Sequence, residues 1–313
     1  MQPEVMTTEW ILFGAVMLGL LAIDLYVHRG GQGDSRRRAI QWSLIWIAAG
    51  LAFCGHIWMK FGGQEAQEYL AAYLIEKSLS LDNLFVFLII FKSLKIPKNH
   101  QRTALSWGIF GALVFRAIFI FLGAAALERW EWVQYLFAAI LFYAAFHAFR
   151  EDPSEQKENR AVEWLSRHFP VSRKTDTHRF AFRENGNWVA TPLLIAVLSL
   201  ELTDVIFAVD SIPAAFSVTR NTYIIYSSNV FAILGLRALY LVLAHTIGEL
   251  KYLHYGLAAV LAFAGAKMIV STWIEIPPLV SVGIIAACIG VAAWASMRRR
   301  AGSPAGEQEP AAS

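Results

Sequence analysis

The chain has 313 residues, of which 57% are hydrophobic and only 16% are charged. A soluble domain of this length carries more charge and interrupts its apolar runs more often, so the composition excludes an ordinary soluble protein. The net charge of +3 is small and does not indicate a nucleic-acid partner.

Runs of about 18 or more apolar residues are typical of membrane-spanning helices. The sequence contains nine such runs and predicts an all-α, polytopic membrane domain over residues 1–300, followed by a disordered tail at 301–313. The first run is not expected to be a cleaved signal peptide, because the segment before it is acidic rather than basic. The predicted spans are 10–27, 40–59, 69–91, 103–126, 132–149, 191–216, 224–246, 253–272 and 278–297.

Basic residues are distributed unevenly between the two sides of these spans. Twenty of the 27 Lys and Arg residues fall in the C-terminus and in the loops after the first, third, fifth and seventh spans. Only Lys60, Arg129 and Arg220 fall on the other side. Because basic loops stay in the cytoplasm, we expect the N-terminus outside and the C-terminus in the cytoplasm, in a bacterial-type inner membrane.

The long cytoplasmic loop, at about 150–189, carries structural signals of its own. The sequence DPSE at 152–155 is typical of a helix start, and Val162, Leu165 and Phe169 then recur at helical spacing. The alternating sequence HRFAFRENGNWVA, centred on Asn185-Gly186, predicts a β-hairpin. We expect a connector that lies on the membrane face rather than a catalytic domain.

The sequence carries no recognisable enzyme or cofactor motif. Its only cysteines, Cys54 and Cys288, lie in different spans, so neither thiol metal binding nor dithiol redox chemistry is expected. A nucleotide-binding motif is also missing, so any transport would be driven by an ion gradient, with protons as one option. We expect a protein that is not an enzyme and binds no cofactor tightly, with an oligomer or a membrane complex as possible assemblies.

Two pairs of spans align without gaps. Spans 4 and 7 share five identities in thirteen residues when Arg116 is placed on Arg237. Spans 5 and 8 also share five in thirteen when Tyr135 is placed on Tyr255. Apolar helices share residues by chance, but the matched intramembrane arginine strengthens the first alignment.

Spans 3 and 6 match in their acidic residues. Glu76 falls on Asp204, and Asp82 falls on Asp210. Because each repeat contains three spans, an odd number, the second copy must be inserted upside down. Inverted repeats are typical of transporters whose site lies at the repeat interface near the bilayer midplane. We expect Asp82 and Asp210 to face each other across a pseudo-two-fold axis.

The spans contain six acidic and four basic side chains, each costing about 2.5–3.5 kcal/mol at a helix centre. The surplus of two negative charges would suit one divalent cation, although protonation would equally remove it. Oxygen ligands favour Mn²⁺, Mg²⁺ or Ca²⁺ over soft metals and do not choose among these three. The expected metal ligands are Glu76, Asp82, Asn83, Glu201, Asp204, Asp210 and Ser211, while Asp24, near a span end, either joins them or reaches the interface.

The spacing of the matched acids predicts broken helices. Residues six apart lie about 120° apart around a straight helix, so neither pair can point at one site unless its helix is interrupted. Pro213 removes a hydrogen bond to the carbonyl of Val209 and predicts a break in span 6, with freed carbonyls beside Asp210. The polar sequence EKSLSLDN predicts a distortion of span 3.

The four intramembrane bases are expected to compensate the acids. Arg116 and Arg237 are predicted to be fixed counter-ions rather than substrate ligands. Lys77 and Lys267 are expected either to pair with acids or to extend toward the interface.

These segments resemble a known family. YLIEKSLSLDNLFVF and ELTDVIFAVDSIPAAF are similar to the two signature segments of the TerC/Alx membrane proteins, and SNVFAILGLRALY to the segment that follows. AIDL at 22–25 and ATPL at 190–193 extend the resemblance to nearly the whole chain. The family is associated with tellurium resistance by name and with manganese export in its better-understood members. The resemblance therefore implies Mn²⁺ efflux, with the site residues Glu76, Asp82, Glu201, Asp204 and Asp210.

Three hypotheses follow for the function. The first is a secondary-active Mn²⁺ exporter that alternates access across the inverted repeat, with the metal ion and the bilayer as its partners. The second is a non-transporting membrane scaffold of a tellurium- or stress-resistance complex. The third, an intramembrane aspartyl protease, ranks last because neither LSLDN nor FAVDS supplies a G-x-G-D motif.

Overall fold

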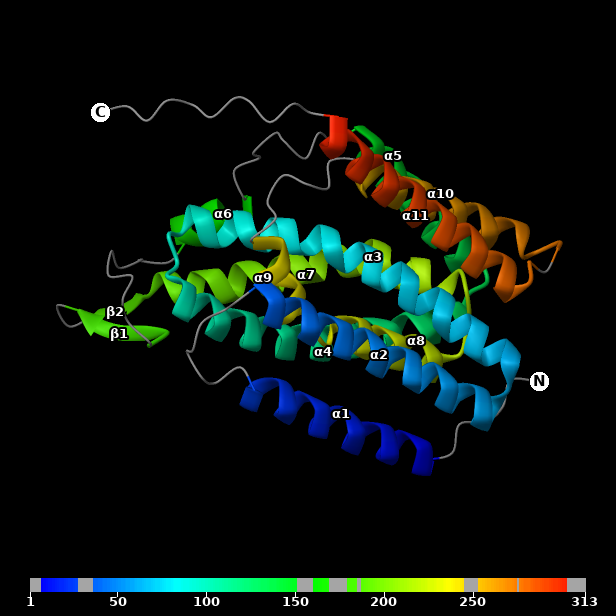
Figure 1. The fold of residues 1–313 in the computed structure, drawn as a ribbon, viewed down its shortest axis with the longest axis horizontal. Coiled ribbons are helices and arrows are strands. Elements are labelled where there is room, and N and C mark those ends of the chain that lie inside the picture. The colour runs from blue at the N-terminus through cyan, green and yellow to red at the C-terminus, as the bar shows by residue number, and fades with distance from the viewer. Residues whose placement is uncertain are drawn as a thin grey trace.

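The computed structural model describes residues 7–27, 36–150, 160–168, 179–184, 187–244, 253–274 and 276–302. Figure 1 shows a bundle of long helices with a small two-stranded sheet beyond one end. The helices are α1 (Thr7–Val27), α2 (Arg36–Phe61), α3 (Gly63–Ser93), α4 (Lys98–Arg129), α5 (Val133–Arg150), α6 (Arg160–His168), α7 (Pro192–Phe216), α8 (Thr222–Ile233), α9 (Leu236–Ala244), α10 (Leu253–Val270) and α11 (Pro278–Gly302).

Seven spans among the described residues are long and apolar enough to cross a membrane, when α8 and α9 are taken together. The polytopic all-α class is therefore confirmed. The other two predicted spans, 69–91 and 253–272, fall on α3 and α10, which are helical but do not qualify by length and composition alone. The count of nine spans stays a prediction. Helices suit this setting because a helix satisfies its own backbone hydrogen bonds where no water is available.

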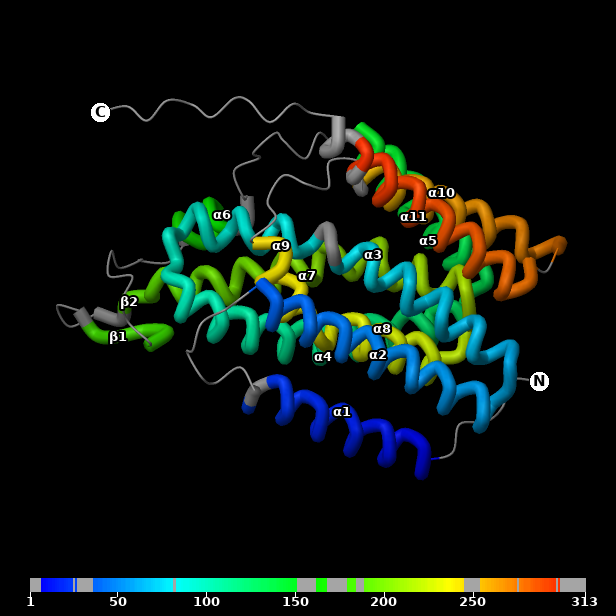
Figure 2. Tube along the Cα trace, viewed as in Figure 1, coloured from blue at the N-terminus to red at the C-terminus, as the bar shows by residue number. Residues whose placement is uncertain are grey.

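Most of the helices fall into two packed groups. One core joins α2, α3, α4, α8 and α9 through residues such as Trp46, Tyr69 and Phe231. A second core joins α5, α10 and α11 to α3, around Leu141, Leu261 and Ile285. Figure 2 traces both groups, with α5, α10 and α11 lying together and α1 lying on the outside of α2. The central helices α3 and α7 are therefore covered by other helices, which is where buried polar groups can be held.

The central helices pair in a regular way. α3 packs against α8, α4 packs against α7, and α5 packs against α10. α3 and α7 also contact each other, and they run through the bundle in opposite directions (Figure 1). The chain thus brings the two acid-bearing helices together at the centre.

The loop between α5 and α7 contains the predicted secondary structure. Val162 and Leu165 are buried on α6, which packs against α7. Strands β1 (Ala181–Glu184) and β2 (Asn187–Ala190) pair antiparallel, with Ala181 opposite Ala190, so the predicted hairpin is confirmed. The predicted helix cap at 152–155, Phe169 and the turn Asn185-Gly186 lie outside the described residues.

The predicted helix interruptions are wrong in position. α3 is continuous, and α7 runs without a break from Pro192 to Phe216 although it contains Pro213. Pro213 lies within the last turn, so only one backbone hydrogen bond is lost near the helix end. The interruption occurs instead in the seventh predicted span, where α8 ends at Ile233 and α9 begins at Leu236.

Gly235 explains this interruption. Its φ is +86°, a conformation that other residues rarely adopt. A Cβ at this position would also lie 2.6 Å from the Cβ of Trp46 on α2. Both the left-handed backbone and the close approach of α2 therefore require glycine at the junction of α8 and α9.

Candidate functional site

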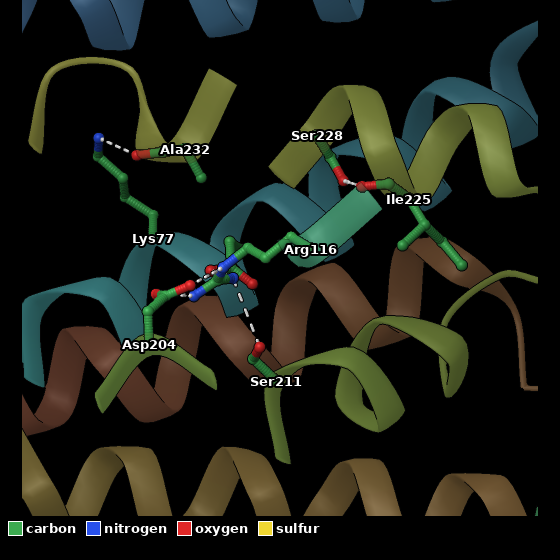
Figure 3. A network of polar contacts seen from close by, with 8 residues as sticks. Lys77, Arg116, Asp204, Ser211, Ile225, Ser228 and Ala232 are labelled. Carbon is green, nitrogen blue, oxygen red and sulfur yellow. Dashed lines mark hydrogen bonds and ion pairs between the residues drawn. The ribbon is translucent and has the colours of Figure 1, made fainter. Parts of the chain in front are cut away.

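A buried arginine joins the two acid-bearing helices. Arg116 of α4 is only 1% exposed. Its Nε and Nη2 donate to the two carboxylate oxygens of Asp204 on α7, at 3.2 and 3.0 Å. Its Nη1 donates to Glu76 on α3. The same nitrogen lies 3.4 Å from the hydroxyl of Ser211 on α7, to which it donates (Figure 3). The two acids that align in the sequence thus share one guanidinium.

The charges around Arg116 do not balance. One guanidinium faces the two carboxylates of Glu76 and Asp204, and a buried Glu76 oxygen has no hydrogen-bond partner among the described residues. Asp210 interacts electrostatically with both Glu76 and Arg116, and one of its own buried oxygens also lacks such a partner. If all three acids are ionised, this centre has more negative than positive charge, and it presents free oxygen acceptors.

Glu201 lies one helical turn before Asp204 and faces a different neighbour. Its carboxylate lies against Gly111 of α4, where any Cβ would collide with it. One of its oxygens is buried and has no hydrogen-bond partner in the part of the chain that the structure describes. Glu201 and Asp204 share a helix face at this spacing, so Glu201 borders the Arg116 centre without contacting its guanidinium.

The matched arginine has different partners. Arg237 of α9 is buried, and its Nη1 lies 3.4 Å from a carboxylate oxygen of Asp24 on α1. The same nitrogen approaches the backbone carbonyl of Asp24, and Nη2 donates to the hydroxyl of Ser106 on α4. Asp24 is itself buried within the protein. Its described ion pair is with Arg237 rather than with the centre around Arg116, so Asp24 is not grouped with the other expected metal ligands.

The two lysines contact uncharged groups. Lys77 of α3 donates to the backbone carbonyl of Ala232 at the end of α8, at 3.0 Å. Lys267 of α10 donates to the hydroxyl of Ser281 on α11, at 2.9 Å. Neither forms an ion pair among the described residues, although Lys77 interacts electrostatically with its neighbour Glu76.

The remaining predicted ligands are placed less completely. Asn83 is buried on α3. Asp82 lies in α3 as well, but its side chain is not among those described, so its expected approach to Asp210 stays a prediction. Within the described residues, no three or more His, Cys, Asp or Glu side chains are grouped so that they could hold a metal ion. The acids around Arg116 are held by that guanidinium instead.

Sequence reasoning missed the partners that are not charged. Ser106 contacts Arg237, Ser281 contacts Lys267, and the carbonyl of Ala232 accepts from Lys77. Serines and backbone carbonyls carry no distinguishing signal in an apolar run. Gly235 carries no distinguishing signal in the sequence either, because Gly50, Gly108 and Gly111 lie in continuous helices.

Comparison with known proteins agrees with this architecture. The family model described as "Integral membrane protein TerC family" matches residues 61–302. A Myxococcus xanthus protein named "Uncharacterized membrane protein STKORF319" is 40% identical over 96% of this chain and 95% of its own. The Escherichia coli K12 protein "Putative membrane-bound redox modulator Alx" is 39% identical over 88% of this chain and 90% of its own.

A plant protein shares the same similarity. The Arabidopsis thaliana protein "Thylakoid membrane protein TERC, chloroplastic" is 40% identical over 86% of this chain and 71% of its own. No solved structure matches the chain. The family model covers the aligned spans together with the buried acids of α3 and α7, so this chain belongs to the TerC family of integral membrane proteins.

Proposed function

We propose that this protein exports Mn²⁺ from the cytoplasm by alternating access. The observation that carries the proposal is the meeting of Glu76 and Asp204 at Arg116 in the interior of the bundle. Acids within membrane helices are costly and mark ion pathways. Two acids from different helices at one buried point are difficult to explain by packing alone.

The helix packing supports an inverted repeat. If spans 3–5 correspond to spans 6–8, then α3 corresponds to α7, α4 to α8 and α9, and α5 to α10. A two-fold axis that exchanges the two sets of spans would turn the contact between α3 and α8 into a contact between α7 and α4. It would also place α5 in contact with its own counterpart, α10. All three contacts occur. The acids then lie at the interface between the repeats, which is where transporters of this kind bind their substrates.

The donor atoms suit a hard divalent cation. Carboxylates supply most of the expected ligands, with the Ser211 hydroxyl and the Asn83 amide beside them. This set fits Mn²⁺, Mg²⁺ and Ca²⁺ equally, and the choice of Mn²⁺ rests on the resemblance to manganese exporters. The name of the Escherichia coli relative mentions redox modulation, but Cys54 and Cys288 are free thiols on α2 and α11, which gives no dithiol for such chemistry.

Arg116 defines what must change when the metal enters. In this conformation its guanidinium already neutralises part of the charge of Glu76 and Asp204. A divalent cation at the same carboxylates would repel the guanidinium, so loading requires Arg116 to withdraw or the ion to bind on the Asp210 side. A site that exchanges an internal cation for its substrate has the two arrangements that alternating access requires.

We propose the orientation predicted by the basic loops, with the N-terminus outside the cytoplasmic membrane. In support, α1 begins at the end of the bundle opposite α6 and the β-hairpin (Figure 1). A cysteine introduced at Ser154, in a background lacking Cys54 and Cys288, should not react with an impermeant thiol reagent in intact cells. Ready labelling there, before the cells are permeabilised, would reverse the orientation.

The central test replaces Asp210 by Asn, and separately Asp82 by Asn. Each substitution keeps the shape and one acceptor oxygen but removes a charge that a low-dielectric site makes important. We expect both variants to insert normally and to lose Mn²⁺ efflux. The measurement is cellular manganese after a Mn²⁺ load in an efflux-deficient host, normalised to the protein in the membrane.

A matched control is Glu9→Gln, which removes a carboxylate that pairs with Lys60 away from the site. This variant should keep full efflux. Flux measurements in liposomes with Mn²⁺, Mg²⁺ and Ca²⁺ at several pH values then establish which metal is carried. Wild-type efflux by either Asn variant at equal abundance would refute the coordinating role and favour the scaffold hypothesis.

A further inference from the structure

Helix α8 ends with a backbone carbonyl that has lost its usual partner. In a continuous helix, the carbonyl of Ala232 would accept from the N–H of Leu236. Gly235 turns the chain away, and no backbone N–H among the described residues donates to Ala232. Ala232 is fully buried, so the vacant acceptor needs a partner from elsewhere.

That partner is a cation. The Nζ of Lys77 lies 3.0 Å from the Ala232 carbonyl oxygen, and it reaches this position from α3, 155 residues earlier in the chain (Figure 3). The final carbonyls of a helix carry the negative end of its dipole, which favours a positive charge close to the axis. The position of the Lys77 ammonium, its positive charge and its hydrogen bond all indicate that it compensates the vacant carbonyl at the end of α8.

Interrupted helices in other membrane transporters use the same geometry for free ions, since carbonyls at the end of a half-helix coordinate Na⁺. We propose that the C-terminal end of α8 is a binding site for a small monovalent cation, and that the ammonium of Lys77 is its resident occupant. The wild-type protein then requires no free monovalent ion at this position. Shortening the side chain should open the site to Na⁺, K⁺ or NH₄⁺.

This site differs from the proposed metal pathway, although Glu76 is the preceding residue. Lys77 contacts the end of α8, whereas Glu76 contacts Arg116 on α4. Because α8 is interrupted at this point and α4 is not, the cation site has no equivalent in the first repeat. Its test measures thermal stability and does not depend on whether the protein moves Mn²⁺.

The experiment compares Lys77→Ala with Lys77→Met in the purified full-length protein. Alanine leaves room for an ion, while methionine fills the space with an uncharged chain. Melting is followed in NaCl, KCl or NH₄Cl against choline chloride at equal ionic strength. We expect Lys77→Ala to gain about 2–4 °C when the small cation reaches about ten times its dissociation constant. Wild type and Lys77→Met should melt at the same temperature in all four salts.

Three results would overturn the proposal: no response of Lys77→Ala to any small cation, an equal response of Lys77→Met, or an equal response of wild type. If Lys77→Ala does not accumulate, Lys77→Ser replaces it. Serine is too short to reach the Ala232 carbonyl and leaves the space of the lysine chain open, so a small cation should again raise the melting temperature. The same absence of a response would then count against the site.

Discussion

Arg116 and Arg237 occupy aligned positions in the sequences of spans 4 and 7 but differ in their surroundings. Arg116 lies in a continuous helix and pairs with two acids of the repeats, Glu76 and Asp204. Arg237 follows the interruption at Gly235 and pairs with Asp24 on α1, which belongs to neither repeat. The two aligned spans thus each supply an arginine, and the surrounding helices decide which acid it contacts.

The difference shows that the two aligned arginines do not have equivalent partners. If the repeats were strictly equivalent, Arg237 would meet the same central acids from the opposite side. Asp24 and Ser106 hold it elsewhere, which leaves those acids to Arg116 alone. Substitutions that remove one arginine at a time should therefore have unequal effects on stability. Each loss should be compensated by neutralising a different acid.

The largest effect is expected for Arg116→Leu. It leaves Glu76 and Asp204 buried beside each other without a cation, and removing one partner of a single buried pair already costs about 3–5 kcal/mol. We expect little protein in the membrane. Adding Asp204→Asn should restore part of the abundance, measured by fluorescence-detected gel filtration, because one uncompensated charge is removed. Normal abundance of Arg116→Leu alone would show that the acids need no counter-ion.

A smaller loss is expected for Arg237→Leu, because it breaks the ion pair with one acid, Asp24, rather than with two. The cost should lie near the lower end of about 3–5 kcal/mol. Asp24→Asn should rescue this variant and fail to rescue Arg116→Leu, while Asp204→Asn should show the opposite preference. Melting temperatures of the four double variants measure this exchange. If Asp24→Asn and Asp204→Asn rescued each arginine variant equally, the two arginines would share one electrostatic environment.

The sequence predicted which residues are buried but not how they are paired. Hydrophobic run length placed the seven helical spans that qualify by length and composition, and alternation around Asn185-Gly186 placed the hairpin. Charge alone identified Arg116 and Asp204 as unusual, because each is costly in hydrocarbon wherever it lies. Pairing depends on which helices are neighbours, and uniformly apolar faces carry little information about that. The helix interruption was assigned to Pro213, although a proline in the last turn is tolerated and a glycine with positive φ is not replaceable.

The smallest effect concerns that interruption. Gly235→Ala must place a side chain in a left-handed conformation, at about 1–2 kcal/mol, and must also displace Trp46. The matched position in α4 is Val114, which lies in a continuous and partly exposed helix, so Val114→Ala should be nearly neutral. Melting of the two purified variants gives the comparison directly. If Trp46→Ala restores part of the stability of Gly235→Ala, the close approach of α2 contributes to the cost, and the remainder measures the backbone conformation. Equal effects at 114 and 235 would show that the interruption between α8 and α9 is not a fixed feature of the second repeat.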